Sequence, residues 1–397
     1  MIVTGIEFKY INDMSQKKIL IVTRNLPPLI GGMERLNWHI ADELSYENDV
    51  LLLSHREAKQ QAPKNCQFFG ITLNPLPLFL ILAFCHTFLI CLRHKPDILF
   101  AGSGLTAPIT VFWAKIFRKK SIVYVHGLDI NNNSQLYQFL WLSFIRQANQ
   151  IIANSTPTKN LAIKKKVKES KIEIIHPGVS FPPSPKNLKL IKSLKDRFNL
   201  HQKKVLLSVG RLTERKGILE FIQNCLPSIV QAEPNTRLVI IGDTAVYALN
   251  NKFQTHDQIL RIAEQYCVKK NIVFTGAIKD EELSQFYYLA DVHVFPVKHI
   301  SNDPEGFGMV AIEAAAHGTP TVAFATGGII DAIKNSISGY LIDCNNYKNL
   351  ARHVVYVLKN NPTIENDCQS FASDFSWPNL GKKMNKIINS VNDSKDS

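Results

Sequence analysis

Short apolar runs alternate with helix-length segments along almost the whole chain, and this alternation constrains the fold more than any other feature. Each run has the length of a strand and is apolar on both faces, which is typical of a buried parallel sheet. The runs are Ile19–Val22, Val50–Leu53, Asp97–Ala101, Ile122–Val125, Ile151–Ala153, Ile172–Ile175, Val205–Val209, Leu238–Ile241, Ile272–Phe274, Val292–Phe295, Thr321–Ala325 and Tyr340–Ile342. The repetition predicts an α/β fold with two doubly wound, Rossmann-like sheets.

The segments between the runs have helical length. They include Met33–Ser45, Ser134–Gln147, Leu219–Val230, Gln258–Val268 and Met309–His317. Residues 178–204 are rich in proline and lysine and lack strand character, which indicates a linker between the two sheets. We therefore expect an N-terminal domain over residues 1–190, a C-terminal domain over residues 191–375, and a final helix and tail over residues 376–397.

The composition excludes several classes of protein. Hydrophobic residues make up 45% and charged residues 20%, which rules out a disordered, collagen-like or coiled-coil chain. The seven cysteines form no C-x-x-C pair, which argues against a zinc module or a disulfide framework and predicts a reducing, cytoplasmic location. The net charge of +13 favours anionic partners, namely nucleic acid, phosphorylated metabolites or an acidic membrane surface.

The longest apolar stretch is Leu76–Leu92. It is close to the lower limit for a membrane span, which needs ~20 residues. A span would put neighbouring strands of one sheet on opposite sides of a bilayer, so we interpret the stretch as a buried or surface-docking helix. The lysine-rich segments 164–171 and 186–204 lie in the same half of the chain or its linker. Together these features predict peripheral contact with an anionic membrane.

In open α/β sheets, ligands bind beyond the carboxyl ends of the strands, so the residues that follow each run are the candidates. Gly31 and Gly32 follow the first run at the start of a helix, where bare N–H groups can approach an anion. His126 directly follows the strand run that ends at Val125, and Asp243 lies in the turn after another run.

The loop Gly210–Gly217 leaves a strand and enters a helix, and it carries Arg211 and Lys216. A guanidinium and an ammonium that converge on a helix N-terminus suit a diphosphate. The Walker pattern G-x-x-x-x-G-K-[ST] is absent from the chain, so this loop is not a P-loop.

The densest signal is Asp303–Gly318. Glu305 lies just before a helix whose free N–H groups, from Phe307 to Val310, can receive an anion or a sugar hydroxyl. Glu313 lies inside the same helix, where its carboxylate would face the same cleft and could hold both hydroxyls of a ribose. Gly306, Gly308 and the small residues Ala314–Ala316 would let this helix pack close to the sheet.

Glu305 and Glu313, within EGFGMVAIEAAAHGTPTVA, resemble the donor-site signature of the retaining nucleotide-sugar glycosyltransferases of family 4. Similarity covers roughly residues 19–390. The further motifs that carry it are Gly31–Glu34, Val125–Gly127, Ala153–Ser155, His176–Val179, Gly210–Leu212 with Lys216–Gly217, and Thr326–Gly328. The fold that the resemblance implies is GT-B, in which two Rossmann-like domains face a central cleft and a C-terminal helix, here Trp377–Asn389, crosses back to the first domain.

The resemblance also implies residue roles. Arg211 and Lys216 would neutralise the donor diphosphate, and with Glu305 and His126 they form the expected catalytic set. Asn25 and Glu34 would lie near the acceptor. The expected donor-binding residues are Gly32, Arg211, Lys216, Asp243, Ile278, Glu305, Gly306, Phe307, Gly308, Met309, Val310 and Glu313.

The activity implied by the resemblance is transfer of a hexose or N-acetylhexosamine from a UDP- or GDP-sugar to a saccharide or lipid-linked acceptor, in the synthesis of a cell-surface polysaccharide, lipopolysaccharide or glycolipid. No further cofactor is expected. The chain contains no aspartate-x-aspartate, so no metal is expected at the diphosphate. The alternatives are another GT-B enzyme, such as a nucleotide-sugar epimerase or a phosphorylase, and a basic nucleic-acid-binding protein. The lysines at 164–171 have no interleaved aromatic residues to stack bases, which disfavours nucleic acid.

Overall fold

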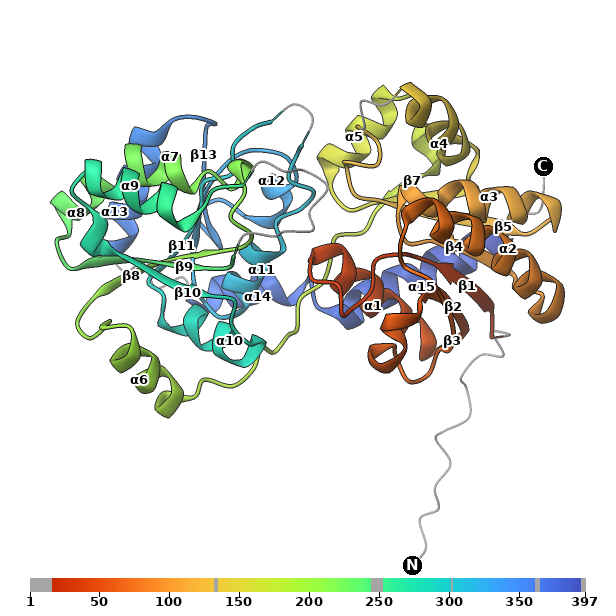
Figure 1. Ribbon diagram of the computed structural model, residues 1–397, viewed down its shortest axis with the longest axis horizontal. Helices are drawn as coiled ribbons and strands as arrows, with labels where there is room; N and C mark the ends of the chain where they lie inside the picture. Colours follow the sequence, from red (N-terminus) through yellow and green to blue (C-terminus); the bar gives the residue numbers. More distant parts are fainter. Residues whose placement is uncertain (1–15, 132–134, 244–252, 301–302, 361–364, 394–397) are drawn as a thin grey trace, which may run out of the picture.

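The computed structural model describes residues 16–131, 135–243, 253–300, 303–360 and 365–393. They form two parallel sheets covered by helices, and the two resulting domains lie side by side along the long axis of the molecule (Figure 1). This arrangement confirms the expected α/β architecture with two doubly wound, Rossmann-like domains.

The N-terminal sheet has seven parallel strands in the order β3-β2-β1-β4-β5-β6-β7. Its strands are β1 (Lys18–Val22), β2 (Asp49–His55), β3 (Gln67–Ile71), β4 (Ile98–Ala101), β5 (Lys120–Val125), β6 (Gln150–Ala153) and β7 (Ile172–Ile174). Its helices are α1 (Gly32–Ser45), α2 (Leu76–His94), α3 (Ala107–Ile116), α4 (Gln135–Gln147) and α5 (Thr156–Lys164).

The C-terminal sheet has six parallel strands in the order β10-β9-β8-β11-β12-β13. Its strands are β8 (Lys204–Val209), β9 (Thr236–Ile241), β10 (Ile272–Gly276), β11 (Val292–Phe295), β12 (Thr321–Phe324) and β13 (Gly339–Ile342). The remaining helices are α6 (Leu188–Arg197), α7 (Ile218–Asn224), α8 (Leu226–Ala232), α9 (His256–Gln265), α10 (Asp280–Leu289), α11 (Met309–Ala316), α12 (Ile329–Ala332), α13 (Tyr347–Asn360), α14 (Glu365–Ser373) and α15 (Trp377–Asp393). In both sheets the strand order reverses beside the first strand, which places a ligand-binding crevice at β1 and β4 and at β8 and β11.

Two elements differ from the sequence expectation. Strand β3 has no counterpart among the apolar runs, because it is an edge strand that is interrupted by Gly70 and faces solvent along much of its length. The segment Leu219–Val230 is two helices rather than one. Pro227 has no backbone N–H to continue the helix, so the chain breaks at Cys225 between α7 and α8.

The expected linker contains helix α6. Asn187 caps it by accepting a hydrogen bond from the N–H of Leu190, and its apolar face packs against α10 through residues that include Ile191 and Leu194. A helix with lysines on its outer face therefore accounts for the lysine-rich composition. The boundary expected between residues 190 and 191 falls inside this helix, which as a whole packs with the C-terminal domain.

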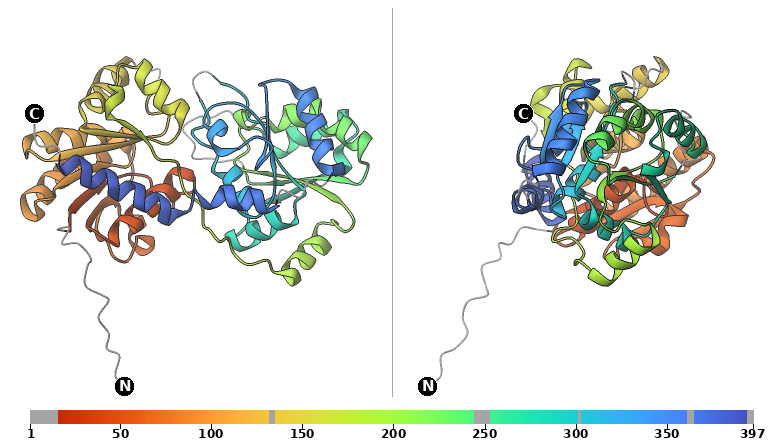
Figure 2. Two further views of the ribbon diagram at one scale, coloured as in Figure 1. Left: turned by 180° about the vertical axis from the view of Figure 1, so that it is seen from behind. Right: turned by 90° about the vertical axis from the view of Figure 1, so that its left-hand side faces the viewer.

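The last helix, α15, crosses back to the N-terminal domain, as the resemblance implied. Its residues Trp377, Leu380 and Met384 are buried in the core cluster that contains the apolar face of α1. Figure 2 shows α15 lying along the outside of the N-terminal domain. The chain thus passes between the domains twice, and the two passages are hydrogen-bonded to each other through Val179, whose N–H donates to the carbonyl of Phe375 at 2.7 Å.

Candidate functional site

Two helix N-termini face each other across the cleft between the domains. Helix α1 begins at Gly32, and α11 begins at Met309 after β11. A Cβ added to Gly32 would lie 3.2 Å from the sulfur of Met309, so a side chain at this position would crowd the opposite domain. Free backbone N–H groups and the positive ends of two helix dipoles therefore meet here, which is an environment that attracts an anion.

Beside these helix ends, Glu305 lies between two cations. Its carboxylate accepts hydrogen bonds from the Lys216 ammonium at 2.9 Å and from the Arg215 guanidinium. The Nε of Arg215 also lies 3.4 Å from a carboxylate oxygen of Asp303. The side chains of Glu305, Arg215 and Lys216 are only 13%, 12% and 14% exposed, so this ion-pair cluster is largely shielded from water.

The charges in this cluster strongly perturb one another. Burial alone would raise the pKa of Glu305, but Arg215 and Lys216 outweigh it and hold this pKa at about 2. Burial lowers the pKa of Lys216, and repulsion from Arg215 and Arg211 adds to the effect, against the attraction of Glu305. The three cations Arg211, Arg215 and Lys216 exceed the two carboxylates Glu305 and Asp303 by one positive charge. This excess favours binding of an anion.

Arg211, which was expected to grip the same anion as Lys216, is exposed at the end of β8. The turn after β9 lies against it, because the N–H of Leu212 donates to the carbonyl of Asp243 at 3.2 Å. Asp243 is thus placed at the Arg211 loop by its backbone. The half-buried side chain of Ile278 packs against the core of the C-terminal domain.

The loop that carries Glu305 also contacts the N-terminal domain. A Cβ on Gly306 would lie 2.8 Å from the amide nitrogen of Asn154 and 2.9 Å from the carbonyl of His126. The imidazole of His126 is 8% exposed, and its Nε2 donates to the carbonyl of Gly102 at 3.0 Å. One nitrogen of this ring is therefore committed to holding the ring in place at the cleft.

The remaining expected residues at the start of α11 contribute backbone rather than side chains. The ring of Phe307 stacks on His176, which follows β7, with 5.0 Å between centroids, so it points toward the segment that leads out of the N-terminal domain. Gly308 caps the helix in the left-handed region at φ 94°, where a side chain would be strained, and Val310 follows in the first turn. On the opposite side of the cleft, Asn25 Nδ2 donates to Glu34 Oε1 at 2.7 Å, so the two expected acceptor residues are in contact.

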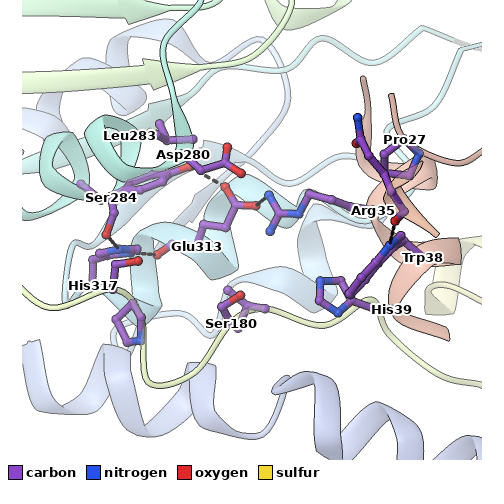
Figure 3. Close-up of a pocket in the computed structure, with 15 residues that line it drawn as sticks. Pro27, Arg35, Trp38, His39, Ser180, Asp280, Leu283, Ser284, Glu313 and His317 are labelled. Atoms are coloured by element: carbon purple, nitrogen blue, oxygen red, sulfur yellow. Dashed lines mark hydrogen bonds and ion pairs between the residues drawn. The ribbon is translucent and has the colours of Figure 1, made fainter. Parts of the chain in front are cut away.

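Glu313 makes an ion pair across the cleft. Its Oε1 lies 2.8 Å from the Arg35 guanidinium of α1, and its Oε2 accepts a hydrogen bond from the Tyr287 hydroxyl at 2.9 Å. Figure 3 shows Arg35 reaching from one domain to Glu313 in the other. A cavity of about 420 Å³ adjoins this pair, and its walls include Trp38, His39, Asp280, Leu283 and His317. Within the described residues, no three His, Cys, Asp or Glu side chains gather as a metal site would require.

Both halves of the sequence match known protein families. Residues 191–373 match the family Glycosyl transferases group 1, and residues 30–181 match Glycosyltransferase Family 4. The chain belongs to glycosyltransferase family 4. The enzyme is 25% identical, over 72% of its own chain and 70% of the relative's, to an uncharacterized glycosyltransferase of Methanocaldococcus jannaschii. It is 24% identical, over 82% of its own chain and 85% of the relative's, to a GDP-mannose-dependent alpha-(1-6)-phosphatidylinositol monomannoside mannosyltransferase of Mycolicibacterium smegmatis.

Solved structures confirm that the glycosyltransferase has the GT-B fold. HepE of Anabaena in complex with UDP superposes with a TM-score of 0.78 at 18% identity, covering 94% of this chain and 100% of that one. The two-domain α/β fold is thus shared over nearly the full length of both proteins.

Four residues of the candidate site, Arg35, Arg215, Tyr287 and Asp303, were not predicted from the sequence. Arg215 and Asp303 lie inside the two densest motifs and Arg35 directly follows Glu34, so their closeness in sequence to predicted residues could have pointed to them. Tyr287 lies in no motif, and nothing in its neighbourhood in the sequence distinguishes it.

Proposed function

We propose that the enzyme transfers a hexose or N-acetylhexosamine from a UDP- or GDP-sugar to a hydroxyl of a saccharide or lipid-linked acceptor, with retention of anomeric configuration. The observation that carries this proposal is the convergence of two helix N-termini and a net positive cluster of side chains at the cleft. Such a site suits a diphosphate and the negative charge that develops as it leaves.

In this proposal the donor replaces protein contacts with its own. The diphosphate binds at the N-terminal ends of α1 and α11 and draws Arg211 and Lys216 toward it. Glu305 then shares its cations with the donor and accepts hydrogen bonds from sugar hydroxyls. Glu313 exchanges Arg35 for the two hydroxyls of the ribose, so each carboxylate keeps a polar partner in both states.

Retention is proposed to follow from attack of the acceptor on the same face from which the diphosphate departs. Glu305, with a pKa held at about 2, is a weak base and stays ionised, so it is poorly suited to remove the acceptor proton. The departing phosphate would take that proton instead. In this scheme the Arg and Lys side chains stabilise the phosphate while its charge grows.

The acceptor is proposed to be a saccharide or lipid-linked saccharide that meets the enzyme near Asn25 and Glu34. The name of the Mycolicibacterium relative specifies a phosphatidylinositol monomannoside as acceptor, which supports a lipid-linked class for that family member. The setting proposed for this enzyme is the cytoplasmic side of a membrane, in the assembly of a cell-surface polysaccharide, lipopolysaccharide or glycolipid.

The diphosphate site is tested by comparing UDP, UMP, GDP and GMP in isothermal titration calorimetry. For the preferred base, the diphosphate should bind at least tenfold more tightly than the monophosphate. Lys216→Ala should reduce this advantage and lower turnover by ~10²–10³, the usual result of losing one electrostatic stabiliser. Lys192→Ala, an exposed lysine on α6, is the matched control. Equal affinity for di- and monophosphates in the wild-type enzyme would refute the site.

Retention is tested separately by NMR of the product. The anomeric proton signals should show the same anomeric configuration as in the donor sugar.

Transfer is also proposed to proceed without a divalent metal, because Arg211, Arg215 and Lys216 supply the positive charge. Activity should be unchanged within twofold after dialysis against EDTA. Complete loss that Mg²⁺ or Mn²⁺ restores would contradict this part of the proposal.

A further inference from the structure

Helix α2 is apolar around its whole circumference. One side, with Phe79, Ala83 and Ile90, packs on the N-terminal sheet. The opposite side exposes six large apolar residues, with exposed fractions from 36% to 61%: Leu78, Ile81, Phe84, Phe88, Leu89 and Leu92. A surface helix of a globular protein normally carries polar residues on its outer face. This outer face is therefore built to contact something other than water.

The apolar surface continues onto α3, which packs beside α2. The rings of Phe84 and Phe88 lie 4.7 Å and 4.9 Å from that of Trp113, and Ile116 is 58% exposed at the end of α3. Neither helix contains an aspartate or a glutamate. We refer to this continuous surface of α2 and α3 as the α2–α3 face.

Basic residues edge one end of the α2–α3 face. Both helices lead into neighbouring parallel strands, so they run in the same direction and their C-terminal ends lie together. Exposed cations gather at these ends: Arg93, Lys95, Lys115 and Arg118. Lys171 belongs to the same edge, because the Lys115 ammonium donates to the side chain of Gln147 and the Lys171 ammonium donates to the carbonyl of the next residue, Ala148, at 2.8 Å. The carboxylate of Asp97 is engaged here by Lys119 at 3.6 Å and does not balance the exposed cations.

We propose that the α2–α3 face rests on the surface of an anionic lipid bilayer, with its apolar side chains at the headgroup boundary and its basic edge on lipid phosphates. An apolar helix face with clustered cations has the two attractions that peripheral membrane binding needs. Charge complementarity selects an anionic lipid surface over a second copy of the chain, whose own basic edge would repel this one. Among the residues that the structure describes, α2 is the one helix long and apolar enough to span a bilayer. It connects two strands of one sheet and packs on that sheet, so we place it on the membrane surface rather than across it.

The α2–α3 face also adjoins the acceptor side of the cleft. Asn74, just before the start of α2, accepts a hydrogen bond from the Arg24 guanidinium at 3.4 Å, and Arg24 precedes Asn25. This step rests on the proposed function: a lipid-linked acceptor held in the bilayer would meet the cleft at the N-terminal end of α2. The lysines at 186–204 take no part, because α6 lies at the opposite end of the molecule (Figure 1).

The test is flotation of the full-length enzyme with vesicles of phosphatidylglycerol and phosphatidylcholine, compared with vesicles of phosphatidylcholine alone. The paired variant Ile81→Glu with Leu89→Glu places charges at exposed positions of the α2–α3 face, and Leu188→Glu is the control at a 71% exposed position on α6. Arg93→Glu with Arg118→Glu reverses the basic edge, and Lys189→Glu with Lys192→Glu is its control. UDP or GDP binding and melting temperature show that each variant is folded.

The bound fraction of wild-type enzyme should be at least tenfold higher on the anionic vesicles and should fall as salt screens the cations. Both α2–α3 variants should lose this binding by at least tenfold, while both α6 controls keep it and all variants bind nucleotide normally. Indifference of the wild-type enzyme to anionic vesicles would overturn the proposal, as would equal binding by the face variants and their controls. A dimer that the Ile81→Glu with Leu89→Glu pair converts to monomer, without vesicle binding, would assign the face to self-association instead. Normal nucleotide binding in each of these cases leaves the proposed reaction standing.

Discussion

Glu305 neutralises two shielded cations, so removal of its charge should affect folding as well as activity. Glu305→Gln leaves Lys216 without its anion and Arg215 with Asp303 alone, and breaking a buried ion pair on one side typically costs about 3–5 kcal/mol. We expect a loss of roughly 3 kcal/mol in the free energy of unfolding by urea at pH 7. Glu34→Gln, which can still accept from Asn25, should cost less than ~1 kcal/mol.

The pH dependence of the same variant provides a second measurement. The pKa of Glu305 is about 2 in the folded enzyme against an ordinary 4.5. Its contribution to stability is therefore complete above about pH 4.5 and is lost as the pH falls from there toward 2. Glu305→Gln should lose stability less steeply than the wild type between pH 5 and pH 3. Parallel curves would show that Glu305 does not carry this charge effect.

At this scale the sequence predicts which residues share the cleft but not how they pair. Strand ends and a dense motif placed Glu305, Lys216 and Glu313 at one edge, because parallel strands end together. The Glu305–Lys216 contact and the Arg35–Glu313 ion pair depend on side-chain directions and on how the domains meet. Neither is encoded in residue spacing along the chain.

The contact of α15 with α1 should make stability sensitive to mild acid. The ring of His39 on α1 stacks on Trp377 of α15 at 3.9 Å between centroids, and burial together with Arg35 lowers its pKa from 6.5 to about 3. The neutral imidazole therefore contributes stability fully above about pH 6.5, and the contribution is lost as the pH falls toward 3. His39→Gln should show a flatter melting temperature than the wild type between pH 6.5 and pH 4.5. The exposed His201→Gln is the control, and an equal slope for His39→Gln would contradict the expectation.

Most elements could be predicted, because a strand that is buried on both faces has a strong hydrophobic signal. All twelve apolar runs correspond to observed strands, whereas the edge strand β3 has one solvated side and a glycine and gave no such signal. Helix α6 was concealed by its composition, since proline precedes it and lysines cover its outer face. The sequence left open whether α2 is buried or docks at the surface, because α2 is apolar on its buried and its exposed side alike.

The Arg35–Glu313 ion pair links the two domains. Arg35→Ala should widen the distribution of interdomain distances, seen as a larger radius of gyration in small-angle X-ray scattering. It should not weaken binding of the preferred nucleotide, because Glu313 is freed for the ribose. Glu313→Gln should instead weaken the apparent affinity for the donor more than it lowers kcat, since ribose contacts act on the ground and transition states alike.

These two variants separate the roles of the pair. A tenfold weaker affinity for UDP or GDP in Arg35→Ala would place Arg35 on the nucleotide rather than on Glu313. A pure kcat defect in Glu313→Gln would move that carboxylate from the ribose to the reacting sugar. A glutamine at 313 can still accept from Tyr287, so misfolding is not expected to mask either outcome.

The two passages of the chain between the domains are bonded side by side, with the N–H of Val179 donating to Phe375 and the N–H of Trp377 donating to Val179. We expect this joint to favour rotation of one domain about a line through Val179 over sliding of the domains past each other. Binding of donor and acceptor would then change the same angle. A small rotation at Val179 would move the residues far from it most, so the width of the cleft would change most on the side away from this joint.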